Sequence, residues 1–183
     1  SNYFMLSDEL TLPLNNQTYS EIPAKASGND CFNSSPGSDD WYDTVKLNYT
    51  NRSTWLKMSK IIEYWANMGV DGFRCDMAEM VPVEFWEWLI SGVKNNFKNL
   101  IFIAELYSRD KYELFLEKGK FDFLYDKTGL YDTLRDVIGN KLPASSITSA
   151  WQAVDSIQNR LLNFLENHDE VRIASDFFAG NPE

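Results

Sequence analysis

The sequence has few of the residues that build metal centres or disulfide frameworks. It contains one histidine and two cysteines in 183 residues. The single histidine, His168, excludes any multi-histidine metal centre, and no cysteine–histidine spacing is typical of a zinc site. A disulfide between Cys31 and Cys75 stays open as an alternative, although buried free thiols are the commoner state for such a pair.

Long apolar runs and positive charge are also scarce. No apolar run approaches the roughly 20 residues that span a bilayer, so we expect no membrane span. Residues 1–5 lack the basic region and apolar stretch of a signal peptide. The net charge of −10 argues against a nucleic-acid partner, whose phosphates are bound by Lys and Arg. The hydrophobic fraction of 44% fits a globular domain, and the charge balance favours a neutral substrate.

Residues 1–50 are rich in Asn, Ser, Asp, Gly and Pro. This composition predicts a loop-rich insertion, or the end of an inserted subdomain, with a short strand or two. Three acidic residues there could bind calcium through oxygen atoms, although a solvated acidic loop is the simpler interpretation. They are Asp39, Asp40 and Asp43. The neighbouring aromatic residues Trp41 and Tyr42 could stack on sugar faces.

From residue 51 the sequence alternates between helical and strand-like segments. The strand-like runs cover residues 70–76, 100–105, 121–125 and 161–166. Helical spacing predicts helices over residues 53–68, 83–97, 110–118, 131–138 and 147–158. The tryptophans in helical segments are expected to pack in the core: Trp55, Trp65, Trp86, Trp88 and Trp151. Alternating strands and helices predict right-handed βαβ units and a parallel sheet.

Three acidic residues lie where strand-like runs are expected to end. They are Asp76, Glu105 and Asp169. Parallel strands would bring all three carboxylates to the same end of one sheet or barrel. Converging carboxylates on an apolar scaffold suit acid–base and nucleophilic chemistry on a glycosidic bond.

The neighbours of these acids suggest different roles. Arg74 and Asp76 are two apart on a strand and share a face, so the guanidinium should lower the pKa of Asp76. Glu105 ends an apolar run that should raise its pKa, which suits a general acid. His168 and Asp169 could bind sugar hydroxyls. A structural ion pair, a solvent-exposed glutamate and a polar turn are the respective alternatives. A Ser-His-Asp hydrolase is a weaker hypothesis, because no Gly-x-Ser-x-Gly segment is present.

Three segments resemble short motifs of the α-amylase family, glycoside hydrolase family 13. They are Gly72-Phe73-Arg74-Cys75-Asp76-Met77-Ala78, Phe102-Ile103-Ala104-Glu105 and Phe164-Leu165-Glu166-Asn167-His168-Asp169, in the order of the family. The resemblance extends from about Trp41 to the C-terminus and includes Leu47-Asn48-Tyr49. It implies that Asp76 is the nucleophile, Glu105 the acid/base and Asp169 the transition-state stabiliser. It also implies that Arg74 is the supporting arginine and that His168 contacts substrate.

The resemblance implies an α/β fold, namely part of a TIM (β/α)8 barrel. Residues 51–183 would supply about strands four to seven with their helices, after the loop-rich insertion of residues 1–50. The implied function is a retaining glycoside hydrolase or transglycosylase acting on α-1,4-linked, starch-like glucans or maltooligosaccharides. A non-catalytic carbohydrate- or protein-binding fragment is the alternative. An extracellular, periplasmic or cell-surface location would fit a polysaccharide-degrading parent, but the sequence does not set the compartment.

Two departures from the family pattern qualify these expectations. The earliest family motif, Asp-x-x-x-Asn-His, is absent, and it supplies a histidine and a calcium ligand. No cofactor is therefore expected with certainty, although a full-length protein could hold structural calcium. Glu79-Met80 stands where many members have Lys-His, so Glu79 becomes a candidate substrate contact, together with Tyr107. We expect about half a barrel, with open edges that favour self-association and without activity on its own.

Overall fold

In the computed structural model the chain divides into two compact units, unit 1 (residues 1–61) and unit 2 (residues 62–183). The described residues are 3–6, 10–14, 17–21, 24–27, 41–175 and 178. Cys31, Asp39 and Asp40 lie outside them, as do the side chains of Trp41, Tyr42 and Asp43. The calcium and sugar-stacking predictions at these positions stay predictions, whereas Cys75 is a free thiol, so the alternative of a disulfide is not borne out.

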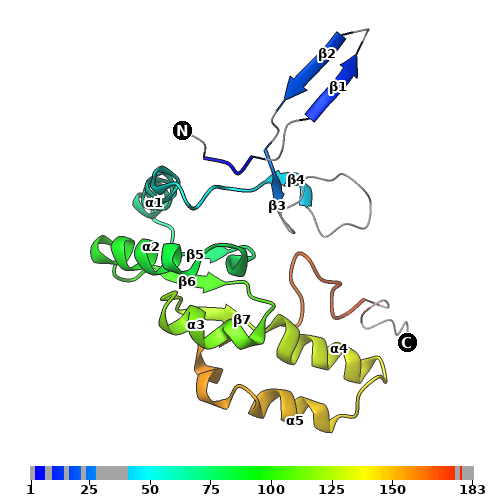
Figure 1. Cartoon of the computed structure of the whole chain (residues 1–183). Helices are drawn as coiled ribbons and strands as arrows, with labels where there is room; N and C mark the ends of the chain where they lie inside the picture. The colour runs from blue at the N-terminus through cyan, green and yellow to red at the C-terminus, as the bar shows by residue number, and fades with distance from the viewer. Residues whose placement is uncertain are drawn as a thin grey trace. The chain divides into compact units, whose positions relative to one another are not determined.

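Unit 1 contains more strand than the sequence predicted. Strands β1 (Leu10–Leu14) and β2 (Gln17–Glu21) form an antiparallel hairpin, and β3 (Ala26–Ser27) pairs antiparallel with β4 (Trp41–Val45). The hairpin is drawn as two blue arrows in Figure 1. The prediction of one or two strands was wrong here, because residues 10–14 pair with residues 17–21 through backbone hydrogen bonds that composition does not reveal.

Helix α1 (Arg52–Asn67) spans the boundary between the units and ends before Gly69. Gly69 has a φ of 91°, which is the left-handed conformation that glycine adopts most easily. The predicted helix over residues 53–68 is confirmed to within about a residue at each end. Its Trp65, in contrast, is 49% exposed, so the expectation that this ring packs in a core was wrong for the described residues.

The centre of unit 2 is a parallel four-stranded sheet in the order β5-β6-β7-β8. Its strands are β5 (Gly72–Cys75), β6 (Ile101–Ala104), β7 (Phe123–Tyr125) and β8 (Leu161–Leu162). The predicted parallel sheet is confirmed. The prediction of a strand over residues 161–166 was wrong beyond Leu162, because residues 163–170 are fixed by side-chain contacts and not by strand pairing.

Helices alternate with these strands in unit 2. They are α2 (Val83–Asn96), α3 (Tyr112–Glu117), α4 (Asp132–Ile138) and α5 (Ser145–Gln152). Shorter helical segments cover Ala78–Met80, Arg109–Lys111, Lys127–Tyr131 and Asp155–Arg160. The predicted helix over residues 147–158 is therefore two segments, and Trp151 in the first is 43% exposed rather than packed. Helices α4 and α5 lie side by side (Figure 1).

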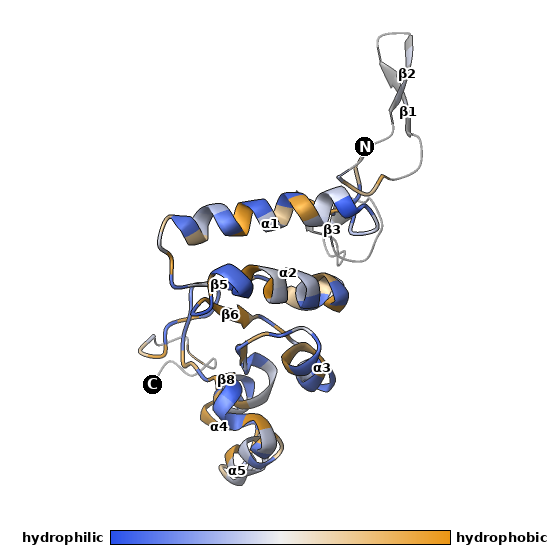
Figure 2. Cartoon of the chain, turned by 90° about the vertical axis from the view of Figure 1, so that its left-hand side faces the viewer, coloured by the Kyte–Doolittle hydropathy of each residue, from blue (hydrophilic) through white to orange (hydrophobic). Residues whose placement is uncertain are grey.

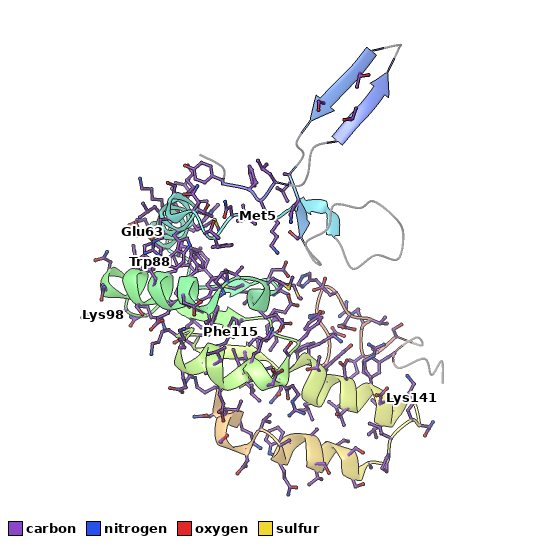
Figure 3. All side chains as sticks on the ribbon, in the orientation of Figure 1. Met5, Glu63, Trp88, Lys98, Phe115 and Lys141 are labelled. Carbon is purple, nitrogen blue, oxygen red and sulfur yellow. The ribbon has the colours of Figure 1, made fainter. Side chains whose placement is uncertain are left out.

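The core of unit 2 lies between α2, α3 and the sheet. Hydrophobic residues recur along α2, where Figure 2 shows orange bands between blue ones, and one face is buried through Phe85, Trp86, Leu89, Ile90 and Val93. Trp86 packs edge-on against Phe121 with ring centroids 5.0 Å apart, and Phe115 stacks on Phe121 at 6.1 Å. Figure 3 labels Phe115 among the side chains of α3. Each such buried side chain contributes about 1.5–3 kcal/mol.

The amino ends of the strands are tied by a network around Asp122. Its carboxylate accepts from Lys94 Nζ at 2.6 and 2.7 Å and from the Phe102 backbone N–H at 2.8 Å. Arg160 Nε donates to the Asp122 carbonyl at 2.6 Å, and the same guanidinium reaches the Phe121 carbonyl. These bonds join α2, β6, β7 and β8 at the edge opposite the acidic residues.

Gly72 allows β5 to approach β6 closely. A Cβ atom on Gly72 would collide with the carbonyl oxygen of Ile101, its partner across the parallel pair. Gly72→Ala is therefore expected to destabilise the full-length protein by about 1–3 kcal/mol, because only a backbone shift relieves the clash. Thermal unfolding measures this. Gly92→Ala on α2 is the matched control, since nothing lies within 4 Å of its Cβ position; it should be neutral or stabilise by up to about 1 kcal/mol. Equal unfolding temperatures for the two variants would contradict the prediction.

In the part of the chain that the structure describes, no helix combines the length and the apolar character that crossing a membrane requires. Strands β5 and β8 stand at the two ends of the described four-stranded sheet. Self-association through these edges stays a prediction, as does a domain boundary near residue 50.

Candidate active site

Two of the three predicted acids lie directly after neighbouring parallel strands. Asp76 follows β5 and Glu105 follows β6. Since Cys75 is opposite Ala104 in the register, the next residue on each strand brings the two carboxyl groups to the same edge of the sheet. Asp169 reaches this edge differently, from a loop well beyond β8.

The Arg74 guanidinium joins the three acids. Its Nη1 lies 2.5 Å from Asp76 Oδ1, and its Nη2 lies 2.7 Å from Glu105 Oε1 and 3.8 Å from Asp169 Oδ2. The guanidinium also faces the ring of Tyr125 on β7 at 5.3 Å. A planar cation with several donors can hold carboxylates in a fixed relative geometry, which a lysine cannot do. The sequence predicted the pairing with Asp76 but not the contacts with the other two acids.

Backbone contacts fix Glu105 in place. Its side chain is only 5% exposed, and its Oε2 accepts a hydrogen bond from the Met77 N–H at 2.9 Å. The Glu105 N–H donates to the Cys75 carbonyl, and the Glu105 carbonyl accepts from the Ala78 N–H, both at 3.0 Å. Met77 has a φ of 39°, a left-handed conformation that is uncommon for residues other than glycine. Strained backbone of this kind often occurs at functional sites.

The environments of Asp76 and Glu105 move their pKa values apart. Burial raises the pKa of Asp76, but hydrogen bonds from Glu105 and Arg74 outweigh this effect and hold the pKa below its usual value. Burial raises the pKa of Glu105 above its usual value, and its hydrogen bond to Asp76 acts in the same direction, against the Met77 N–H and the Arg74 charge. Both directions are those expected from the sequence. The pair therefore favours an ionised Asp76 beside a protonated Glu105.

Glu105 is buried and the Asp76 side chain is 77% exposed, and Asp169 and His168 are also exposed. Their side chains are 53% and 69% exposed, and His168 Nε2 lies 3.2 Å from Asp169 Oδ2. The Asp169 N–H donates to Asn167 Oδ1 at 2.9 Å, which tightens the turn. The structure thus brings all five of the main predicted residues together: Arg74, Asp76, Glu105, His168 and Asp169.

Glu79 and Tyr107 lie beside this cluster, but the Glu79 carboxylate already accepts hydrogen bonds from other residues of the protein. The Glu79 side chain is 8% exposed and accepts from the Tyr107 N–H at 3.2 Å and from Lys111 Nζ at 3.3 Å. Burial raises the pKa of Glu79, but hydrogen bonds from Ser108, Tyr107 and Lys111 outweigh this effect and hold the pKa below its usual value. Glu79 thereby holds the loop that follows Glu105. The Tyr107 side chain is 40% exposed, so its ring is accessible. Substrate contact by either residue stays a prediction.

Sequence reasoning missed Glu170, which has a 13% exposed side chain and binds Lys127, Tyr131 and Arg135. Its adjacency to Asp169 was the only available signal. Among the described residues no group of three His, Cys, Asp or Glu side chains could hold a metal ion, so no residue of that part is assigned to calcium. Cys75 is a free thiol whose pKa burial raises to about 12, which makes it a poor nucleophile.

Curated relatives of the chain share a name. An α-1,4-glucan:maltose-1-phosphate maltosyltransferase of Picrophilus torridus is 33% identical over 88 residues, which are 46% of this chain and 14% of that protein. The enzyme of the same name from Rhodospirillum rubrum is 39% identical over 71 residues, or 39% of this chain and 10% of that protein. The chain therefore spans a small part of the length of these relatives.

Solved structures of other proteins share this fold. A maltogenic α-amylase from Thermotoga neapolitana is 31% identical with a TM-score of 0.57, over 72% of this chain and 30% of that chain. A debranching enzyme from Nostoc punctiforme matches with a TM-score of 0.69 over 97% of this chain and 37% of that chain, at 19% identity, which supports the fold alone. The four parallel strands alternating with helices agree with part of a TIM barrel.

A family match covers most of the chain. The profile of the family described as alpha amylase, catalytic domain, matches residues 40–181, which include Arg74 and the three acids. With its parallel strands and its strand-end carboxylates, the chain belongs to the α-amylase catalytic-domain family and covers part of that larger domain.

Proposed function

We propose that Asp76, Glu105 and Asp169 catalyse retaining glycosyl transfer on α-glucans in the full-length protein. The observation that carries the proposal is that one guanidinium contacts both carboxyl groups, with Arg74 Nη1 2.5 Å from Asp76 Oδ1 and Nη2 2.7 Å from Glu105 Oε1. Retaining enzymes place their two carboxyl groups about 5–5.5 Å apart, whereas inverting enzymes need about 6.5–9.5 Å to admit a water molecule. Two carboxyl groups held by one guanidinium lie close together, which favours the retaining arrangement over one that admits a water molecule between them.

In the proposed first step, a carboxylate oxygen of Asp76 attacks the anomeric carbon. The glycosidic C–O bond breaks, its electron pair goes to the leaving oxygen, and Glu105 donates its proton to that oxygen. In the second step, Glu105 takes a proton from water or from a sugar hydroxyl as the oxygen attacks the same carbon. The bond to Asp76 then breaks and restores its carboxylate. Two displacements retain the α configuration.

The other residues of the site support this chemistry in distinct ways. Arg74 stabilises ionised Asp76 and fixes it relative to Glu105. Asp169, exposed at the edge of the cluster, would bind ring hydroxyls more tightly as the sugar flattens in the transition state. His168 would donate a hydrogen bond to the substrate from the same loop.

In this proposal β5 to β8 are the fourth to seventh strands of a (β/α)8 barrel whose other strands lie elsewhere in the full-length protein. Active sites of such barrels lie at the carboxyl ends of the strands, where Asp76 and Glu105 are found. The 183-residue chain alone would then hydrolyse no maltooligosaccharide and would serve at most as a carbohydrate- or protein-binding fragment. Turnover by the isolated chain that Glu105→Gln abolishes would contradict this part of the proposal.

Transfer to a glucan acceptor is the second candidate, favoured by the relatives that are named maltosyltransferases. Both reactions share the first step and differ in whether water or a sugar hydroxyl reaches the intermediate. Loops around Asp169 and segments outside this chain decide that competition.

The full-length protein can be tested with α-maltosyl fluoride, with and without maltohexaose as an acceptor. We expect fluoride release with initial formation of α-maltose or of an α-linked longer oligosaccharide, followed by NMR of the anomeric proton. Maltose 1-phosphate with maltohexaose is assayed in parallel for phosphate release. Initial β-maltose would contradict the retaining mechanism, and absence of turnover with all of these donors and with maltohexaose alone would contradict activity on α-glucans.

A further inference from the structure

Asp169 does not lie on a strand, so contacts other than strand pairing must hold it in place. Strand β8 ends at Leu162, and Asp169 lies on the loop that follows. Its carboxylate is 53% exposed, its contact with Arg74 Nη2 is long, at 3.8 Å, and its 3.2 Å contact is with the exposed neighbour His168 on the same loop. These contacts alone do not fix the carboxylate at the distance that a transition-state contact demands, since a displacement of about 1 Å can cost about 10²-fold in rate.

The next residue, Glu170, is held firmly. Its Oε1 lies 2.9 Å from Lys127 Nζ, and its Oε2 accepts from Tyr131 Oη at 3.1 Å and from Arg135 Nη1 at 3.3 Å. The Glu170 side chain is 13% exposed, against 53% for its neighbour Asp169. Both carboxylate oxygens are therefore occupied by donors of another segment of the chain.

All three donors come from one continuous helical segment. Lys127 and Tyr131 begin and end a π-helical turn, and Arg135 follows in α4, so the three are spaced four residues apart and face the same side. Single π-helical turns are frequent at functional sites. The Asp126 side chain stabilises this turn by accepting from the Leu130 N–H at 3.0 Å.

The turn is built to a specific shape. A Cβ on Gly129 would collide with the carboxylate of Asp126, which caps the start of the turn, so glycine is required at this position. The Tyr131 ring also stacks on Phe164, with centroids 4.9 Å apart, at the start of the loop that carries Asp169. The π-helical turn thus binds that loop at two places, Phe164 and Glu170.

The same turn also contacts the loop that follows Glu105. Thr128 Oγ1 donates to the Tyr107 carbonyl at 2.8 Å, and Lys127 Nζ lies 5.8 Å from the Tyr107 ring. One helical turn therefore contacts the loop after the proposed acid/base and the loop that carries the proposed stabiliser. The turn can therefore fix the positions of Glu105 and Asp169 relative to one another, as two groups that act on one sugar require.

We propose that Glu170 is a positioning residue for Asp169, acting through a clamp formed by Glu170, Lys127, Tyr131 and Arg135. The clamp fixes the loop so that the Asp169 carboxylate stays next to Arg74 and Glu105. The inference rests on the proposed function, since it assigns the clamp to the transition-state contact of Asp169.

The test is a double-mutant cycle in the full-length protein with α-maltosyl fluoride, followed by fluoride release. Glu170→Gln keeps the size of the side chain but removes the charge that Lys127 and Arg135 bind. We expect kcat to fall by about 10–100-fold with a much smaller change in KM. Asp136→Asn on α4 is the matched control, because it loses an exposed ion pair with Lys141 and should change kcat by less than about 2-fold.

The cycle distinguishes positioning from a general structural role. In an Asp169→Asn background, Glu170→Gln should cost less than about 3-fold, because its effect passes through Asp169. The same fold loss in both backgrounds would overturn the clamp proposal while leaving the proposed function intact. An Asp169→Asn protein of unchanged activity would instead contradict the proposed function.

A milder variant keeps the test decisive if Glu170→Gln does not fold. Tyr131→Phe removes one hydroxyl but keeps the ring that stacks on Phe164. We expect a loss of kcat of about 2–5-fold that vanishes in the Asp169→Asn background. A loss that persists there, or no loss in the parent, would overturn the proposal.

Discussion

Replacing Glu105 by Gln in the full-length protein is expected to lower kcat/KM on maltohexaose by about 10²–10⁴-fold. Glutamine keeps the shape of the side chain and can still accept from the Met77 N–H, but it cannot donate the proton that the leaving oxygen needs. The wild-type residue is suited to donate it, because burial and the hydrogen bond to Asp76 raise its pKa. Initial rates of oligosaccharide cleavage or transfer measure the loss.

A second donor separates this role from a loss of structure. Fluoride leaves without protonation, so formation of the glycosyl-enzyme from α-maltosyl fluoride should be slowed far less by Glu105→Gln than cleavage of maltohexaose. Glu117→Gln, an exposed glutamate on α3, is the matched control and should keep wild-type rates with both donors. Equal losses on both donors in the Glu105→Gln protein would exclude Glu105 as the acid.

The fold of unit 2 followed from local pattern where the pattern was strong. The predicted helices over residues 53–68 and 83–97 form close to their predicted bounds, and the strand-like run over residues 100–105 forms β6 of the parallel sheet. The end of β8 was wrong because Phe164 packs on Tyr125 and Tyr131 as a side chain of a loop, a tertiary contact that strand propensity cannot distinguish from pairing.

The site was predictable to the extent that neighbours in sequence are neighbours in space. The opposite pKa directions of Asp76 and Glu105 could be inferred from Arg74 and from the apolar strand. The contact of Arg74 with Glu105 joins adjacent strands, and the binding of Glu170 to Lys127 joins segments far apart in the sequence. Such contacts depend on register and on a π-helical turn that no sequence pattern signals.

Replacing Arg74 by Met should both slow the enzyme and move its pH profile. Activity requires ionised Asp76 and protonated Glu105, so the profile of kcat/KM is expected to be bell-shaped, with limits that belong to the coupled pair. Burial raises the pKa of Asp76, and Arg74 is among the groups that lower it. Burial also raises the pKa of Glu105, and the charge of Arg74 opposes this rise. Without Arg74 both pKa values increase.

The sign of each shift follows from the form that is active. Activity falls as the pH drops through the pKa of Asp76, so a higher pKa moves the acidic limit to higher pH. Activity also falls as the pH rises through the pKa of Glu105, so the alkaline limit moves in the same direction. We expect the whole profile of the Arg74→Met protein to shift to higher pH, with a loss of at least about 10²-fold at its maximum, because the two carboxyl groups lose their common support.

The pH dependence of kcat/KM on maltohexaose measures both effects in one experiment. Arg109→Met is the control, since Arg109 lines a separate cavity between α3 and the segment after α5 and should leave both limits in place. A lower rate with unchanged limits would mean that Arg74 only supports the fold. Limits that move in opposite directions would contradict the arrangement in which one guanidinium stabilises the ionised form of both carboxyl groups, and with it the assignment of Asp76 and Glu105 as nucleophile and acid.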